Sequence, residues 1–251
     1  MPTTQVPTVQ RIWDLPTRIF HWLLAICVIG AIISANIGGN AMAWHLRFGY
    51  ASLALLLFRV IWGFVGPRYA RFASFPPNPR AAWLYLRGRA SPRPGHSPLA
   101  AWSVYAMLLA VAIQTLTGLF ANDGIMWDGP LRNWVSEATS NSLTGWHLRN
   151  RIVLIALIVL HLAAIIWYRV ARDRRLTRAM ITGDAPLPEA GPHKSAAPGS
   201  AGASQAQSTF FTQTAELARP ETPSARDDFL VRLSGLALAI LCSLAVWALV
   251  R

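Results

Sequence analysis

Five long apolar blocks constrain this chain more than any other feature of its sequence. They lie at about residues 19–37, 44–65, 99–120, 146–168 and 229–250, and each is close to the roughly 20 residues that a helix needs to cross a bilayer. Only 14% of the residues are charged, whereas soluble domains carry about a quarter. Because a chain in lipid must satisfy its backbone hydrogen bonds internally, the sequence predicts an all-α membrane protein.

The charge distribution supports the same class. A net charge of +12 occurs in many nucleic-acid-binding proteins, but here the arginines gather beside the apolar blocks, as in cytoplasmic loops of membrane proteins. With the N-terminus in the cytoplasm, the inner segments of the first four blocks hold 13 basic residues and the outer ones 4. We therefore expect lipid rather than nucleic acid as a partner, with the C-terminus on the periplasmic side.

The chain divides into three parts. Residues 1–182 hold the first four blocks, and within them residues 121–145 are predicted as a loop and the stretch AAWLYLRG at 81–88 as an interfacial helix. Residues 183–228 are rich in Pro, Ala and Ser without periodicity, which is typical of a disordered linker. Residues 229–251 form a single transmembrane helix, which we interpret as an appended anchor or a helix that docks a partner.

Four histidines lie inside or at the ends of the apolar blocks. His147 and His161 are 14 residues apart in the block at 146–168, a spacing of about 21 Å that ends only about 40° short of four full turns. Both imidazoles therefore leave the same face of that helix. His45 begins its block at the outer side and His21 begins its block at the inner side, so the depths pair His45 with His147 and His21 with His161.

Paired histidines at matching depths indicate haem iron. A neutral imidazole is a good axial ligand, and two of them leave no open coordination position, which favours electron transfer. One such histidine is as readily a packing residue, but polar groups inside a bilayer are costly and usually functional. The sequence predicts two non-covalent haem b groups in an up-down four-helix bundle, plus one extra C-terminal helix. His96 and His193 lie in loops and are expected to be solvated.

Four arginines are candidates for binding the cofactor. Arg59 interrupts an apolar run 14 residues after the histidine of the same block, and this spacing places it at the level of the inner haem. A haem propionate is its first expected partner and a quinone oxygen its second, while snorkelling to the interface is the alternative. Arg47, Arg149 and Arg18 lie near other histidines of the set, where simple solvation at the interface is a stronger alternative. No catalytic residue is predicted.

Several segments carry a family resemblance: WDLPTRIFHW (13–22), WHLRFGY (44–50), FRVIWGFVGPRYARF (58–72), QTLTGLFANDGI (114–125), the whole block at 146–168, and RAMITG (178–183). They resemble the bacterial cytochrome b561 family, within the larger group that includes b-type cytochrome subunits of nickel–iron hydrogenases. The resemblance spans residues 11–183. It implies a four-helix bundle whose two b-type haems are held by His21, His45, His147 and His161, and electron exchange between the quinone pool and a redox partner.

The expected function is electron transfer in the bacterial inner membrane between quinone and a periplasmic cytochrome c or an oxidoreductase subunit. A self-contained quinone oxidoreductase linked to superoxide or a metal chelate stays open, as does a membrane anchor subunit of a hydrogenase-like complex. The sequence therefore fits both an electron-transfer protein and a quinone-linked oxidoreductase. A non-redox transporter is disfavoured, because the sequence contains no visible inverted repeat or broken helix.

Overall fold

The computed structural model describes residues 9–87, 89, 95, 97–171, 175–186, 225 and 227–251. Within these ranges, five helices are long and apolar enough to cross a membrane. They are α1 (Leu15–Ile37), α2 (Met42–Val65), α4 (Pro98–Gly118), α5 (Glu137–Ala171) and α8 (Phe229–Val250). Each contains most of one predicted apolar block, which confirms a mainly helical, multi-pass membrane protein.

Shorter elements connect these helices. They are strands β1 (Val9–Arg11) and β2 (Asp184–Pro186), helices α3 (Pro79–Leu86) and α6 (Leu176–Thr182), and 3-10 turns at Gly39–Ala41, Phe72–Ser74 and Arg132–Trp134. Helix α3 covers most of the stretch that is predicted as an interfacial helix.

Local sequence determines where several of the helices begin and end. The side chain of Asp14 accepts a hydrogen bond from the backbone N of Thr17 and caps α1, and Ser97 caps α4 in the same way. Short polar side chains are preferred at this position because they satisfy a backbone N–H that the helix leaves free. Helix α1 ends at Ile37, and the φ of 70° at the following Gly38 is a conformation that favours glycine.

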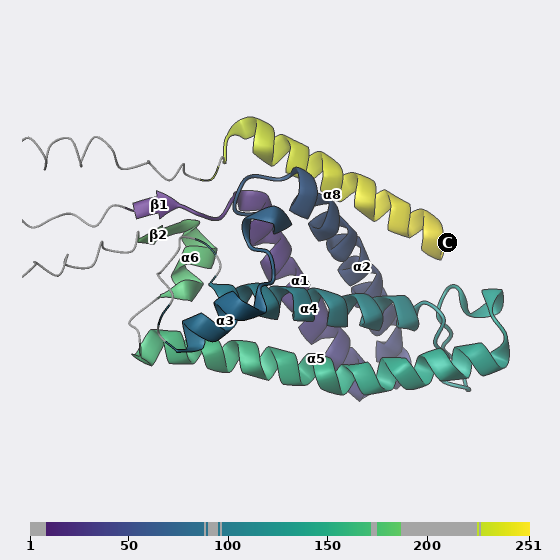
Figure 1. The fold of residues 1–251 in the computed structure, drawn as a ribbon. Helices are drawn as coiled ribbons and strands as arrows, with labels where there is room; N and C mark the ends of the chain where they lie inside the picture. Colours follow the sequence, from purple (N-terminus) through teal and green to yellow (C-terminus); the bar gives the residue numbers. More distant parts are fainter. Residues whose placement is uncertain are drawn as a thin grey trace, which may run out of the picture.

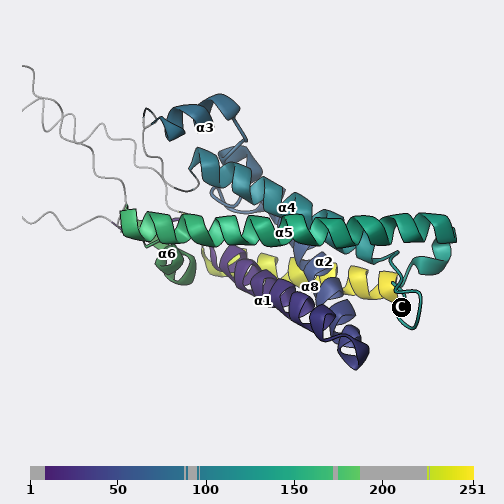
Figure 2. The same ribbon diagram turned by 90° about the horizontal axis from the view of Figure 1, so that it is seen from below.

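The membrane helices pack as two hairpins with α8 at their side. Helix α1 packs along α2, and α4 packs along α5, while α2 also contacts α4 and α8 (Figure 1). The α1–α2 approach is close, since a Cβ on Gly30 would lie 2.6 Å from the ring of Phe48. Helix α5 runs the full length of the molecule, and α1 crosses it obliquely (Figure 2).

The loop predicted at residues 121–145 is shorter than expected, because α5 already begins at Glu137. The start of α5 is capped by Ser136, whose hydroxyl oxygen accepts a hydrogen bond from Thr139 N at 3.2 Å. The additional turns are polar, so the hydropathy that locates a membrane span cannot reveal them. As a result, His147 lies about three turns inside α5 and not near its end.

Helix α8 packs against the other membrane helices along much of its length. A Cβ on its Gly235 would lie 2.6 Å from Pro16, and Cys242 and Val246 are buried against neighbouring side chains. The interpretation of α8 as an appended anchor is therefore incomplete, since it covers one side of α2 and touches α1.

Three segments that are distant in sequence meet at the end of the molecule where α1 and α8 begin. Strands β1 and β2 pair antiparallel, with Arg11 opposite Asp184, and Ala225 N donates to Arg11 O at 2.7 Å. The predicted disordered linker at 183–228 is thus wrong for residues 184–186, which form β2. Residues 187–224 and 226 lie outside the described part of the chain.

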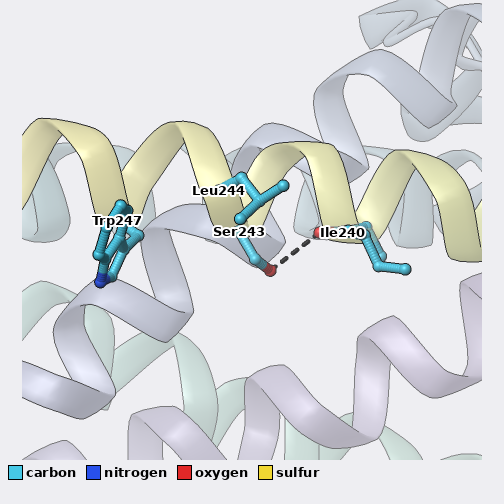
Figure 3. Close-up of a pocket in the computed structure, with 5 residues that line it drawn as sticks. Ile240, Ser243, Leu244 and Trp247 are labelled. Carbon is cyan, nitrogen blue, oxygen red and sulfur yellow. Dashed lines mark hydrogen bonds between the residues drawn. The ribbon is translucent and has the colours of Figure 1, made fainter.

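A shallow hollow lies on the exposed side of α8. Figure 3 shows Ile240, Ser243, Leu244 and Trp247 around it, with the Ser243 hydroxyl donating to the backbone oxygen of Ala239 at 2.8 Å. All of its lining residues come from α8, which carries no histidine. This hollow therefore contributes nothing to a histidine site.

Candidate functional site

The four histidines of the apolar blocks come from three helices and meet in two pairs. The ring centres of His45 (α2) and His147 (α5) are 6.0 Å apart, with an interplanar angle of 84°. Those of His21 (α1) and His161 (α5) are 6.5 Å apart, with an angle of 51°. These are the same two pairs that the depth argument predicts. Both bring side chains of the α1–α2 hairpin to side chains of α5.

The separation of the rings fits a shared metal ion. Two imidazoles that each bind one metal at about 2.0 Å have ring centres roughly 6 Å apart. Aromatic rings in direct contact have similar separations, of about 4.5–7 Å. The spacing alone therefore does not distinguish ligation from packing, and the hydrogen bonds of the ring nitrogens are needed.

Hydrogen bonds determine which nitrogen of each outer histidine carries the proton. His45 Nδ1 lies 2.9 Å from Ala31 O, and His147 Nδ1 lies 2.9 Å from Gln114 O. A carbonyl oxygen only accepts, so both Nδ1 atoms donate, and the lone pair of each neutral ring is on Nε2. Metal-binding histidines commonly donate their second nitrogen to a backbone carbonyl in this way, so the outer pair fits a bis-imidazole site.

The inner pair has a different signature. Among the described residues, three buried side-chain nitrogen atoms have no hydrogen-bond partner, namely Arg18 Nε, His21 Nδ1 and Arg59 Nη1. Two of them belong to the first half of α1 and the third to the second half of α2. A buried polar group without a partner costs about 1–3 kcal/mol and calls for an explanation. Cationic side chains with unused donors fit a site that takes up an anionic group, such as the carboxylates of a haem.

Arg59 is the only one of the four candidate arginines that lies in the interior. It is 4% exposed, and its guanidinium carbon is 4.7 Å from the centre of the Phe72 ring. Arg59 is therefore covered by protein, with its guanidinium turned toward the loop that follows α2. Asp14, which is fully buried, accepts a hydrogen bond from Trp62 Nε1 at 3.2 Å and is the main acidic group acting on Arg59.

The other three arginines have different partners. Arg18 donates to Ile181 O and lies 3.9 Å from the Asp227 carboxylate, so it joins α1 to the segment around α6. Arg47 lies over the ring of Trp44 and Arg149 near that of Trp146, at 4.8 and 6.0 Å; both arginines are exposed. The loop histidines at 96 and 193 lie outside the described residues.

Asn150 is a residue of the site that the sequence did not single out. It is buried on α5, and its side-chain nitrogen donates to Ala110 O at 2.8 Å and to Gln114 Oε1 at 2.7 Å. Its position gives a signal in retrospect, because it lies three residues after His147 and so one helical turn away on a similar face. A lone amide in a helix is nevertheless common, and the sequence alone does not pair it with Gln114.

Comparison with known proteins places these observations in a family. The family described as prokaryotic cytochrome b561 matches residues 12–183. The probable Ni/Fe-hydrogenase 1 B-type cytochrome subunit of Escherichia coli (strain K12) is 27% identical over 135 residues, which cover 43% of this chain and 57% of that protein. The probable Ni/Fe-hydrogenase B-type cytochrome subunit of Bradyrhizobium diazoefficiens is 24% identical over 213 residues, which cover 71% and 86%.

The match to the family covers all four paired histidines and more than half of the chain, whereas the chain spans only 57% of the length of the Escherichia coli relative. Membership of this cytochrome b family implies b-type haem. This chain belongs to the prokaryotic cytochrome b561 family.

Proposed function

We propose that this chain is a dihaem b-type cytochrome, in which His45 and His147 hold an outer haem and His21 and His161 hold an inner one. The observation that carries the proposal is the meeting of these rings in pairs from separate helices, together with the backbone carbonyls at Nδ1 of both outer histidines, which leave each Nε2 lone pair available to a metal. When bound, haem supplies reversible one-electron chemistry. Two protein ligands on each iron leave no open position, which favours electron transfer over oxygen binding.

Helix α5 determines the distance between the two sites. It carries one histidine of each pair, and it is continuous from Glu137 to Ala171. The 14 residues between His147 and His161 therefore place the two sites about 21 Å apart along its axis. A single helix with close packing on α4 keeps this distance constant, which supports electron passage between two fixed sites in the membrane.

Arg59 is proposed to bind a propionate of the inner haem, with a quinone oxygen as the second choice. Its Nη1 is buried without a partner, and a carboxylate there would complete its hydrogen bonds and compensate its charge. Arg18 is proposed as a second donor to an inner propionate through its Nε, which is buried without a partner, while its other nitrogens contact Ile181 O and Asp227. Arg47 and Arg149 are proposed to face the outer propionates from their exposed positions beside Trp44 and Trp146.

The proposed electron path joins the quinone pool to a redox partner at the inner membrane. The names of the relatives are those of hydrogenase cytochrome subunits, so an oxidoreductase subunit is one partner class and a periplasmic cytochrome c is another.

The arginine distribution favours a cytoplasmic N-terminus. Helices α1 and α8 both begin at the β1–β2 end, where Asp227 accepts from Leu15 N, which supports a periplasmic C-terminus.

Haem quantification tests the proposal. The purified protein is expected to contain two non-covalent haems per chain, and His161→Ala and His45→Ala are each expected to retain one. The difference spectra of the two variants should be complementary, because each lacks a different haem. His96→Ala, a matched substitution in a loop, should keep both. A wild-type protein with fewer than two haems, or an unchanged content in His161→Ala, would contradict the assignment.

A further inference from the structure

Helix α4 carries no histidine, yet its side chains and backbone contact the ring of His147, the outer histidine of α5. The backbone oxygen of Gln114 accepts from His147 Nδ1 at 2.9 Å, and the side-chain nitrogen of Gln114 lies 3.0 Å from His147 Nε2. The Thr117 hydroxyl oxygen lies 3.4 Å from Nδ1. Because Nδ1 carries the proton, Nε2 is an acceptor, and the Gln114 amide donates to it. One residue of α4 therefore contacts both nitrogens of this ring.

Asn150 determines how the Gln114 amide is turned. Its side-chain nitrogen donates to Gln114 Oε1 at 2.7 Å and to Ala110 O at 2.8 Å. With its oxygen engaged in this way, the Gln114 amide must present its nitrogen to His147. The bonds form a consistent chain from Asn150 through Gln114 to the ring, and each member has a defined role as donor or acceptor.

Gly118 completes the contact between α4 and the ring. A Cβ at this position would lie 3.0 Å from His147 Cε1 and 3.3 Å from Nδ1. The absence of a side chain thus lets the backbone of α4 approach the imidazole closely, and any larger residue would press on the ring. We call this arrangement the α4 seat. It consists of the carbonyl and amide of Gln114, the close approach at Gly118, and the side chain of Asn150 from α5 that holds the Gln114 amide.

We propose that the α4 seat positions His147 as a ligand of the outer haem, so that Gln114, Gly118 and Asn150 are positioning residues. The inference rests on the proposed dihaem function. The carbonyl at Nδ1 holds the tautomer whose Nε2 can bind a metal, and such a bond also raises the basicity of the ligand. Nε2 has a single lone pair, so the Gln114 amide gives up its bond to that nitrogen when Nε2 serves as a ligand. The carbonyl bond to Nδ1 persists, and the bond from Asn150 to Gln114 Oε1 keeps the amide beside the ligated ring, where removing either side chain changes the surroundings of the iron ligand.

Asn150→Leu and Gln114→Leu, made separately and together in the full chain, test this proposal. The readouts are the midpoint potentials of both haems in a redox titration and their low-spin electron paramagnetic resonance signals. The outer haem is identified as the component that is lost in His45→Ala. We expect each single variant to shift the potential and the resonance signal of the outer haem, while the inner haem stays unchanged.

The double variant provides a sharper criterion. Residues that act through one network are not additive, so the combined shift should be no larger than the larger single shift. Thr115→Val is the matched control on α4, because the Thr115 hydroxyl donates within its own helix to Val111 O at 2.9 Å. It should leave both potentials where they are in the wild type.

Three results would overturn the α4 seat. They are unchanged outer-haem signals in both single variants, equal shifts of both haems, and additive shifts in the double variant. A wild-type protein with two haems and any of these results would refute the seat alone. A wild-type protein with fewer than two haems would instead refute the proposed function on which the seat depends.

Discussion

The side-chain carboxylate of Asp227 holds the start of α8 against the start of α1. It accepts hydrogen bonds from Arg11 Nη1 at 2.6 Å, from Leu15 N at 3.1 Å and from Arg232 Nε at 3.2 Å, and its side chain is 4% exposed. Burial opposes ionisation, but the hydrogen bonds from Arg232, Leu15 and Arg11 outweigh it and lower the pKa of Asp227. The ionised form is thus the one that the folded protein stabilises.

Asp227→Asn should loosen α8. A hydrogen bond to a charged group contributes about 1.5–3 kcal/mol. The Arg232 side chain is 48% exposed, so solvent screening makes its share small, and an asparagine oxygen can still accept from Leu15 N. The expected loss is therefore mainly the Arg11 bond, about 1.5–3 kcal/mol. At 1.36 kcal/mol for each factor of ten, the open population of α8 should rise about 10- to 150-fold.

The thiol of Cys242 reports this opening. It is buried where α8 meets Phe20 and Trp62, so a maleimide reaches it only when α8 separates from that core. The labelling rate of the detergent-solubilised protein, in a Cys27→Ala background that removes the second thiol, should follow the open population. Asp227→Asn should raise that rate by the same factor as the open population.

Asp228→Asn is the matched control, since it makes the same substitution one residue later. Asp228 caps α8 by accepting from Val231 N at 3.0 Å, and asparagine caps a helix about as well as aspartate. The labelling rate of Cys242 in Asp228→Asn should differ from the wild-type rate by less than about threefold. Equal rates in the two variants, or a wild-type rate in Asp227→Asn, would refute the role of Asp227 in holding α8.

Three further outcomes are expected. Gly118→Ala places a Cβ 3.0 Å from His147 Cε1; this overpacking costs about 1–3 kcal/mol and should lower outer-haem occupancy, measured as haem content. Because the pKa of Asp227 is lowered from its unfolded value of about 3.9, its contribution is complete above that pH and is lost as the pH falls through the folded pKa. Cys242 labelling with an acid-tolerant disulfide reagent should therefore rise below about pH 4, and a flat profile would count against the ion cluster. Arg59→Gln removes a positive charge that favours the reduced haem, so a redox titration should show a lower potential for the inner haem only.

Much of the site could be predicted from the sequence, because its signals are local. The lengths of the apolar blocks locate the membrane helices, and the rise and turn of a helix place His147 and His161 on one face. Since successive spans run in opposite directions, the depth of each histidine in its span can be compared with the others. That comparison pairs His147 and His161 with the same histidines of the α1–α2 hairpin that they meet in the structure. None of this required knowledge of which helices pack together.

Other features were decided only by the tertiary structure. The bond from Arg11 to Asp227 joins residues 216 positions apart, and the bond from Asn150 to Gln114 joins residues 36 apart. Such contacts leave no periodic pattern, because each depends on how two separate helices are turned against each other. The same holds for the contact of Arg18 with Ile181 O, which joins residues 163 positions apart. Sequence determined the helices and the depth of each histidine, whereas the arrangement of the helices decided which polar side chains support them.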